Sequence, residues 1–428
     1  MTQIETKTII KALTAQEAAD CLCSLLEPQR RTERVALHEA SGRVLADDFI
    51  TPFPMPPFRR AAMDGYAVCS QDLVEAGPDN PTTLTVVGEI KAGSGLALQS
   101  QFQQMQSGQR QSARIFTGAP VPEQWDTLIV QEAIPLEQRR LNPGSIQLYK
   151  AFRQGEHIAE AGEDIAAGAM ALASGKVLHA KEIAILASFG QAQVSVYEKP
   201  KVAVIPVGDE LLSPGDSFIP YHIYDANSYM AAARLQELGA VVQRFAPVPD
   251  DVEAIADALT LALSQYDLII TIGGVSVGDY DFVAQAAEAA GGSALFRKVL
   301  MRPGKPTSGF IADNRLIISL SGNPSACFAG LELLVKPTVL KAAGYIDYKN
   351  RFLQGTLASG LDKSSPFTRF VRSIAYWQEE RLFVEPLGRD RSGNIAAFAH
   401  ANALAVIPPG ARGAVKGETV SLLPLAGF

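Results

Sequence analysis

The sequence is poor in cysteine, in histidine and in long apolar runs, and each shortage argues against a class of protein. Four cysteines in 428 residues are too few and too scattered for a disulfide framework, so we expect all four to be reduced. Five dispersed histidines form no ligand-spaced cluster, which argues against a structural zinc site. No stretch approaches the length of a membrane span, and the first residues lack a basic segment followed by an apolar core. We therefore expect a cytoplasmic protein with no membrane partner.

Positive charge is also in short supply. The 38 Lys+Arg residues against 45 Asp+Glu residues leave a formal net charge of −7, and no long basic run occurs. This balance argues against nucleic acid as a partner. An anionic ligand would have to be held by local positive groups and by backbone dipoles.

Changes of pattern along the chain predict a multi-domain α/β protein. The length suggests roughly two to four domains. Thr14 and Glu17 form a capping box before a helix over Ala15–Leu26, and short strand-like runs broken by Gly and Pro follow between Ala67 and Tyr149. The proline-dense segment Thr51–Phe58 favours an extended linker. We divide the chain into four domains. They are an N-terminal domain (residues 1–50 and 151–199), a β-rich inserted lobe (51–150), an α/β domain (200–346) and a C-terminal β-barrel or sandwich (347–428).

The α/β domain is indicated by strands and helices that alternate regularly. The expected strands are Val202–Val207, Val241–Val248, Leu268–Ile272, Leu295–Leu300 and Leu316–Leu320. The expected helices are Ser228–Leu238, Val252–Gln265, Phe282–Ala290 and Ser325–Ala343. This alternation predicts a central parallel sheet flanked by helices on both faces.

The stretch DLIITIGGVSVGDYD, residues 267–281, joins a buried strand, a glycine-rich turn and the start of a helix. Gly273, Gly274 and Gly278 fall in the turn, where missing Cβ atoms let backbone N–H groups approach an anion. Asp279 and Asp281 would oppose an anion unless a divalent cation such as Mg²⁺ bridges them. Alternatively, one aspartate caps the helix and the glycines only make a tight turn. The turn taken alone leaves both interpretations open.

Polar or glycine-bearing loops follow five successive strands, and ligands of open α/β sheets gather at the carboxyl ends of strands. Glu210, Asp250 and Asp281 could bind a metal, while Arg302 and Lys305 could hold an oxyanion or phosphate. Taken singly, each could be only a solvated charge or a helix cap. Together they favour phosphoryl-group or nucleotide-linked chemistry, although no Rossmann, Walker A or nucleophile-elbow motif is present. The loops are residues 208–211 (GDEL), 250–251, 273–278, 302–306 (RPGKP) and 321–324 (SGNP).

Seven short motifs carry a family resemblance because they occur in one order across nearly the whole chain. They are AMDGYA at 62–67, TGAP at 117–120, GED at 162–164, GDEL at 208–211, GGVSVGDYD at 273–281, PGKP at 303–306 and GNP at 322–324. In this order the chain resembles the molybdopterin molybdenumtransferases, the MoeA-like proteins that include the gephyrin E domain. The resemblance implies a molybdopterin-binding type of α/β domain and an elongated N-terminal dimerisation domain.

The resemblance also implies an activity. A protein of this kind takes adenylylated molybdopterin and molybdate as substrates, inserts molybdenum into the dithiolene and releases AMP, with Mg²⁺ assisting. It implies a homodimer whose cleft lies between the sheet domain of one subunit and the MDGYA-bearing lobe of the other. Other molybdenum cofactor biosynthesis proteins would be possible partners.

The implied site residues fall into three groups. Asp64 and Asp164 complete a catalytic acidic set with Glu210, Asp250 and Asp281, of which the last three would bind the metal. Arg302 and Lys305 would hold molybdate. The pyrophosphate and pterin portion of the substrate would be contacted by Gly273, Gly274, Ser276, Gly278 and Asn323. Two further cofactor-binding residues would be Thr117 and Arg372.

The chain departs from the family pattern at several positions. Residues 159–161 (AEA) stand where an arginine is common before GED, and Val207 stands where a threonine is common before GDEL. Gly393 and Ala397 replace expected serines, although Arg372 remains. These departures concern molybdate affinity rather than the sheet site, and the sequence leaves molybdate and tungstate undistinguished. Two alternatives also stay open: a molybdopterin adenylyltransferase, which would consume ATP, and a non-catalytic scaffold or binding protein.

Overall fold

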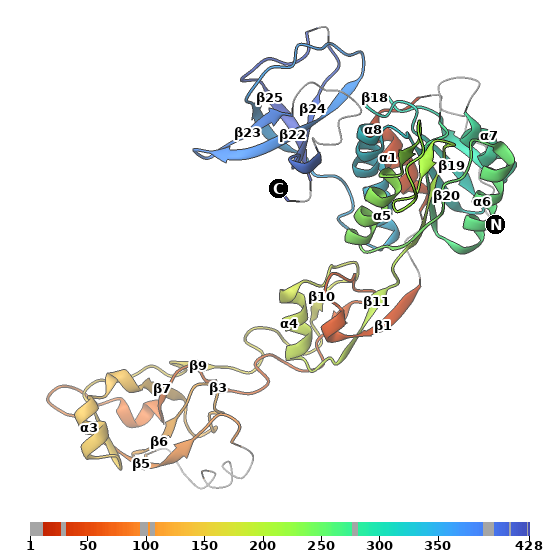
Figure 1. Ribbon diagram of the computed structural model, residues 1–428. Helices are drawn as coiled ribbons and strands as arrows, with labels where there is room; N and C mark the ends of the chain where they lie inside the picture. Colours follow the sequence, from red (N-terminus) through yellow and green to blue (C-terminus); the bar gives the residue numbers. More distant parts are fainter. Residues whose placement is uncertain are drawn as a thin grey trace. The chain divides into compact units, whose positions relative to one another are not determined.

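The computed structural model describes residues 12–26, 31–94, 102, 108–275, 281–387, 398–410, 412–425 and 427–428. The chain divides into two compact units (Figure 1). The first comprises residues 1–47, 175–183 and 192–428, and the second comprises residues 48–174 and 184–191. This division is coarser than the four predicted domains, whose boundaries stay a prediction. Within the described residues, no helix is long and apolar enough to cross a membrane.

A six-stranded sheet with helices on both faces forms the centre of the first unit. Its order is β15-β12-β16-β20-β19-β17. The strands are β12 (Lys201–Pro206), β15 (Val241–Arg244), β16 (Leu268–Ile272), β17 (Ser293–Phe296), β19 (Ser308–Ala312) and β20 (Arg315–Leu320). The helices are α5 (Asn227–Glu237), α6 (Val252–Gln265), α7 (Phe282–Ala289), α8 (Pro324–Gly330) and α9 (Lys336–Ala342), with a π-helical turn η4 (Leu331–Val335) between the last two.

Alternate residues of the central strands enter two different cores. Val204 packs in a core with Leu22 and Leu235, whereas its neighbour Ala203 packs in a core with Leu259 and Val283. Successive side chains of a strand point to opposite faces, so α5 covers one face and α6 and α7 cover the other. The predicted α/β architecture with a helix-flanked sheet is therefore confirmed.

The expected strand over residues 295–300 is wrong in bounds and direction. β17 ends at Phe296 and runs antiparallel to β19, a strand over Ser308–Ala312 that the sequence pattern did not indicate. β19 in turn runs antiparallel to β20. The four strands β15, β12, β16 and β20 are parallel, as predicted. The antiparallel pair lies at the edge of the sheet, where a hairpin can add without a crossover helix.

The first unit contains several further elements outside the six-stranded sheet. The Thr14–Glu17 capping box begins α1 (Ala15–Leu25), as predicted. β1 (Thr32–Ala36) pairs antiparallel with β11 (Gln193–Tyr197). The other elements are η1 (Leu37–Glu39), α4 (Ala180–Ser188), which spans the boundary between the units, β13 (Leu211–Leu212) and β14 (Ile223–Tyr224).

A small β-barrel with its own core ends the chain, as the sequence predicts. β22 pairs with both β23 and β24, and β25 joins β24 to β21, so the strands close on themselves (Figure 1). Leu357, Val384, Ala405 and Leu422 are buried in its interior. The strands are β21 (Leu353–Leu357), β22 (Thr368–Gln378), β23 (Arg381–Pro386), β24 (Ala403–Ile407) and β25 (Thr419–Pro424), with β18 (Met301–Arg302) added beside β22.

The second unit contains the predicted β-rich lobe, residues 51–150, and adds residues 48–50, 151–174 and 184–191. A five-stranded sheet has the order β7-β4-β6-β5-β8, formed by β4 (Gly65–Val68), β5 (Thr82–Ile90), β6 (Gln111–Ile115), β7 (Thr127–Val130) and β8 (Ser145–Leu148). Two short ribbons pair β2 (Phe49–Ile50) with β10 (Met170–Leu172) and β3 (Arg60–Ala61) with β9 (Ile158–Ala159). The helical segments are η2 (Ser70–Leu73), η3 (Gln131–Ala133) and α3 (Leu136–Leu141).

Candidate functional site

The loops that follow the parallel strands are hydrogen-bonded to one another at the carboxyl edge of the sheet. Three backbone bonds of 2.8–3.0 Å join them: Val207 N to Ile272 O, Gly208 N to Val248 O, and Gly273 N to Leu320 O. The Asp209 carboxylate accepts from the Asp250 amide at 3.2 Å. The loops after β12, β15, β16 and β20 therefore lie side by side, as the sequence predicts.

The turn that leaves β16 admits only glycine at its first two positions. Gly273 and Gly274 have φ values of 99° and 62°, a region that L side chains rarely adopt. A Cβ atom on Gly273 would lie 2.1 Å from the Val207 carbonyl oxygen. A Cβ atom on Gly274 would lie 2.8 Å from side-chain carbons of Val207 and Val283. Close packing between loops therefore requires these glycines. Ser276, Gly278 and Asp279 lie outside the described residues.

Two of the predicted metal-binding carboxylates sit on adjacent loops of this edge. Glu210 is exposed. Its carboxylate turns back toward Gly208, since a Cβ atom on Gly208 would lie 2.5 Å from Glu210 Oε2. Asp250 is part-exposed. Its neighbour Asp251, rather than Asp250, caps α6 by accepting from the Ala254 amide at 2.9 Å. The capping alternative for Asp250 is therefore excluded.

Asp281, the third predicted metal ligand, is the N-cap of α7. Its Oδ1 accepts from the Ala284 amide at 3.2 Å. Burial raises the pKa of its carboxyl above the ordinary value, while the Ala284 hydrogen bond and the charges of Arg297 and Lys298 oppose that rise. The helix-capping interpretation is thus correct for this residue, and a metal-binding role stays a prediction.

The RPGKP loop reaches the same edge by a different route from the one expected. It precedes antiparallel β19, whose first residue Ser308 lies opposite Ser319 near the end of β20. A Cβ on Gly304 would lie 3.5 Å from the carbonyl of Ala326 in α8, so the loop packs on the helix that follows SGNP. The beginning of an antiparallel strand lies at the carboxyl edge of its neighbour, which explains the convergence.

The two cations of this loop are both exposed. Arg302 belongs to β18, which pairs with the barrel strand β22 at Arg369. The ammonium of Lys305 lies 5.3 Å from the centre of the Phe367 ring, a cation–π distance. The loop therefore connects the sheet edge to the C-terminal barrel.

Asn323 is the N-cap of α8, and its side chain accepts from the Ser325 amide at 3.2 Å. Sequence reasoning missed the neighbouring Asn227, whose Nδ2 donates to the Gly322 carbonyl at 2.7 Å. This bond ties the start of α5 to the SGNP loop. A polar residue at the start of a helix was the available signal, but it did not reveal this distant partner.

Asp225 is a buried acid at this edge that the sequence analysis also missed. It is only 3% exposed and accepts from both the amide and the hydroxyl of Ser228. Arg244 Nη1 lies 3.8 Å from its Oδ2, and Arg244 Nη2 donates to the Tyr229 hydroxyl at 2.8 Å. The sequence Asp-x-x-Ser before an apolar helix was the only signal.

Arg372, predicted to contact a cofactor, lies in the barrel. It is 8% exposed, and its guanidinium lies 4.8 Å from the centre of the Phe398 ring. The structure thus places it in a stacked, nearly buried position on β22. Gly393 and Ala397, the substituted serine positions, lie outside the described residues.

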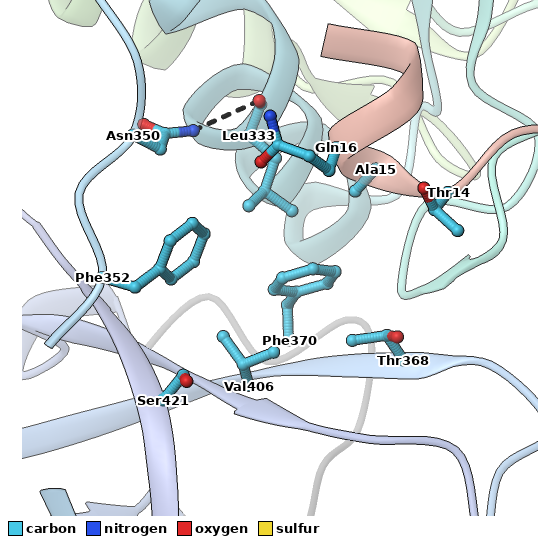
Figure 2. Close-up of a pocket in the computed structure, with 10 residues that line it drawn as sticks. All are labelled: Thr14, Ala15, Gln16, Leu333, Asn350, Phe352, Thr368, Phe370, Val406 and Ser421. Carbon is cyan, nitrogen blue, oxygen red and sulfur yellow. Dashed lines mark hydrogen bonds between the residues drawn. The ribbon is translucent and has the colours of Figure 1, made fainter. Parts of the chain in front are cut away.

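A cavity of about 280 Å³ lies between the barrel and the helices of the first unit (Figure 2). Figure 2 shows Phe370 pointing from its barrel strand toward Leu333, with Phe352 beside it. Its lining surface is mainly apolar, although half of the lining residues are polar, and it contains none of the predicted site residues. The lining residues are Thr14, Ala15, Gln16, Leu333, Asn350, Phe352, Thr368, Phe370, Val406 and Ser421.

Asp64 and Thr117 form a local pair in the second unit. Asp64 Oδ1 accepts from the Thr117 amide at 2.8 Å and from its hydroxyl at 2.7 Å. The backbone hydrogen bond and then the hydroxyl bond lower the pKa of the Asp64 carboxyl. Gly65 is required here because a Cβ would lie 2.0 Å from the Ile129 carbonyl oxygen. Asp164 is exposed, and its amide donates to the Met55 carbonyl.

No three His, Cys, Asp or Glu side chains are grouped as ligands of one metal ion in the part of the chain that the structure describes. The loops that carry Glu210 and Asp250 are hydrogen-bonded to each other. Within the described residues, the two carboxylates belong to no three-residue cluster of this kind. Two carboxylates completed by substrate phosphates are a common environment of Mg²⁺.

Three family models match the chain in sequence order. They are the MoeA N-terminal region (domain I and II) over residues 13–190, a probable molybdopterin binding domain over residues 203–341, and the MoeA C-terminal region (domain IV) over residues 354–425.

Two curated relatives named molybdopterin molybdenumtransferase are each 35% identical to the chain. The one from Bacillus subtilis (strain 168) aligns over 411 residues, which are 96% of this chain and 94% of the relative. The one from Staphylococcus aureus (strain MRSA252) aligns over 390 residues, or 91% and 90%.

Solved structures with the same fold include a molybdopterin biosynthesis MoeA protein from Pyrococcus horikosii. It has a TM-score of 0.81 at 28% identity and covers 98% of this chain and 100% of that chain. A second structure of a MoeA protein, from Pyrococcus horikoshii OT3, has a TM-score of 0.80 at 27% identity, with coverage of 97% and 100%.

Proposed function

This chain belongs to the molybdopterin molybdenumtransferase family, and we propose that it transfers molybdenum from molybdate to adenylylated molybdopterin with release of AMP. It is thus an enzyme of molybdenum cofactor biosynthesis. The product AMP leaves when water cleaves the phosphoanhydride that links the nucleotide to molybdopterin. Water supplies the oxygen that completes the new phosphate group, and the freed proton passes to solvent or to a nearby carboxylate.

The joined carboxyl edge of the sheet is the observation that supports this proposal. The Gly273–Gly274 turn stands between the buried strand β16 and the N-terminus of α7, the type of position at which backbone N–H groups and the helix dipole favour a phosphate. Arg302 and Lys305 supply positive charge on the loop that packs against α8. In this proposal the turn and Asn323 hold the pyrophosphate and pterin portion, and the two cations hold molybdate.

The carboxylates of this edge fit Mg²⁺ by their donor chemistry. Glu210 and Asp250 are solvent-accessible oxygen donors on hydrogen-bonded loops, and Asp281 stands at the start of the helix after the glycine turn. When bound there, Mg²⁺ would neutralise charge on a phosphate oxygen. The protein's own part is to fix the carboxylates beside the turn. Asp64, Thr117, Asp164 and Arg372 remain proposed contacts of the same substrates.

Release of AMP on addition of molybdate tests the proposal directly. We expect the purified protein to release AMP from adenylylated molybdopterin only when molybdate and Mg²⁺ are both present. ATP consumption with free molybdopterin would instead identify an adenylyltransferase. No AMP under any of these conditions would favour the scaffold alternative. Running tungstate in parallel would show which oxyanion is accepted.

We further propose that the protein is a cytoplasmic homodimer that exchanges substrate or product with other molybdenum cofactor biosynthesis proteins. These statements rest on family membership. Sedimentation of the purified protein would test the dimer.

A further inference from the structure

The segment that leads from β13 through β14 carries a series of apolar side chains that are 42–99% exposed among the described residues. We call Phe218, Ile219, Tyr221, Ile223 and Tyr224 the aromatic strip. Their exposed fractions are 67%, 46%, 99%, 57% and 42% respectively. Scattered single apolar residues are normal on a surface, whereas five exposed apolar residues within seven consecutive positions indicate a binding surface.

The C-terminal end of the aromatic strip is bonded to the loops that flank the glycine turn. The Ile223 amide donates to the Glu210 carbonyl at 2.9 Å, which fixes the strip to the GDEL loop. Beyond Tyr224, the Asn227 side chain donates to the Gly322 carbonyl at 2.7 Å, which fixes the chain to the SGNP loop. The strip therefore adjoins the carboxyl edge of the sheet.

Tyr221 has a conformation that its own environment does not explain. Its φ is 70°, a left-handed value that disfavours a bulky residue, and it is 99% exposed. No burial of the ring offsets the backbone strain. By contrast, the Tyr224 hydroxyl donates to the Asp216 carbonyl at 2.9 Å and joins the residues on either side of the segment. The tyrosine ring is thus held out from a segment whose two flanks, Asp216 and Tyr224, are bonded to each other.

We propose that the aromatic strip binds a flat heteroaromatic ring of the substrate, with Tyr221 as the stacking residue. This inference rests on the proposed function, in which the substrate carries an adenine ring and a pterin ring joined through phosphates. If the phosphates are held at the glycine turn, one of the two rings would lie near the GDEL loop, to which the strip is bonded. Aromatic side chains stack on such rings with little dependence on hydrogen bonding. Tyr221 is accordingly a substrate-positioning residue.

The test uses Tyr221→Gly, because glycine adopts a positive φ without strain and should preserve the fold. We expect KM for adenylylated molybdopterin to rise about tenfold with little change in kcat, as when one aromatic partner of a base is removed. Tyr221→Phe should behave like the unaltered protein because the ring is retained. Tyr149→Ala is the matched control, since Tyr149 is another exposed tyrosine, 48% exposed, on the separate unit.

Calorimetric titration with AMP and, separately, with neopterin identifies the ring. Weaker binding of AMP alone assigns adenine to the strip, and weaker binding of neopterin alone assigns the pterin. Unchanged KM and unchanged affinity for both probes in Tyr221→Gly would overturn the inference. So would a loss of dimer in sedimentation with ligand affinity intact, because the strip would then be a subunit contact. Absence of AMP release by the unaltered protein defeats the proposed function separately, while the two titrations still decide whether the strip binds a ring.

Discussion

Gly273 is the residue on which the geometry of the sheet edge depends most directly. Its amide donates to the Leu320 carbonyl, and a Cβ atom on it would lie 2.1 Å from the Val207 carbonyl oxygen. Its Cα would lie 3.4 Å from a Cβ atom on Gly322. Any side chain would push apart loops that carry the predicted phosphate and metal contacts. At Gly273, glycine is therefore required both by the backbone conformation and by the packing around the Cβ position.

Gly273→Ala should destabilise the protein more than a glycine substitution that meets only the conformational demand. Gly291→Ala is the matched control, because Gly291 has φ 83° but open space around its Cβ position. We expect about 1 kcal/mol for Gly291→Ala from the left-handed backbone alone. Gly273→Ala should cost about 2 kcal/mol more from overpacking. Chemical denaturation measures both, and equal losses would contradict the packing argument.

The Asp64–Thr117 pair predicts a pH dependence with a definite sign. The pKa of Asp64 is lowered in the folded protein, so its stabilisation is present above the unfolded value of about 3.9 and is lost as pH falls through the folded pKa. Thr117→Val removes the hydroxyl donor but keeps the amide. We expect the Asp64 pKa to rise toward its ordinary value in a carboxyl NMR titration. Thr117→Ser should leave it low, and an unchanged pKa in Thr117→Val would refute the assignment.

Residue types identified some site residues and missed others for a physical reason. Gly273 and Gly274 were predictable because consecutive glycines between a buried strand and a helix are typical of a tight turn. Asp225 was not, since its burial and its contact with Arg244 depend on packing that spacing does not encode. Asn227 was missed because its partner, Gly322, is distant in sequence.

At the scale of elements, the start of α7 combines a structural and a proposed chemical role in one carboxylate. Asp281 caps the helix, and Asp251 caps α6 in the same manner. Asparagine caps a helix about as well as aspartate but carries no charge. The two positions therefore allow the cap to be separated from metal binding.

Asp281→Asn should retain stability but weaken the dependence of AMP release on Mg²⁺. We expect its unfolding free energy to change by less than about 0.5 kcal/mol, because the cap is kept. The Mg²⁺ concentration for half-maximal rate should rise about tenfold, as when a metal environment loses one contributing group. Asp251→Asn should change neither quantity. Identical magnesium curves for both variants would leave Asp281 as a cap alone.

Helices and strands were predictable where the hydrophobic period and the length of the segment indicated the same element. They were less predictable where a residue such as proline interrupted that pattern. Helix α6 occupies the predicted residues 252–265. The helix expected over residues 325–343 is instead α8, a π-helical turn and α9. Pro337 lacks the N–H that a continuous α-helix would need, and the wider turn before it accommodates that loss. β19 was missed because it joins β20 through a hairpin, which has no crossover helix to mark it.

At the scale of the whole molecule, the residues proposed for one reaction belong to two units. Asp64, Thr117 and Asp164 belong to the second unit, whereas Glu210, Asp250 and Asp281 belong to the first. The family resemblance implies that each site takes its acidic set from two subunits of a homodimer. That arrangement makes a prediction about mixed dimers.

Asp64→Asn and Glu210→Gln should each abolish most AMP release alone but complement each other when mixed. If one site takes Asp64 from one subunit and Glu210 from its partner, a mixed dimer contains one site with both native carboxylates and one with neither. Random exchange after co-unfolding or co-expression gives about half mixed dimers, so about one quarter of the unaltered activity should return. Mixing Glu210→Gln with Asp250→Asn is the control, because both changes lie on the same unit and should not complement. Recovery no greater than that control would place all the required carboxylates within one subunit.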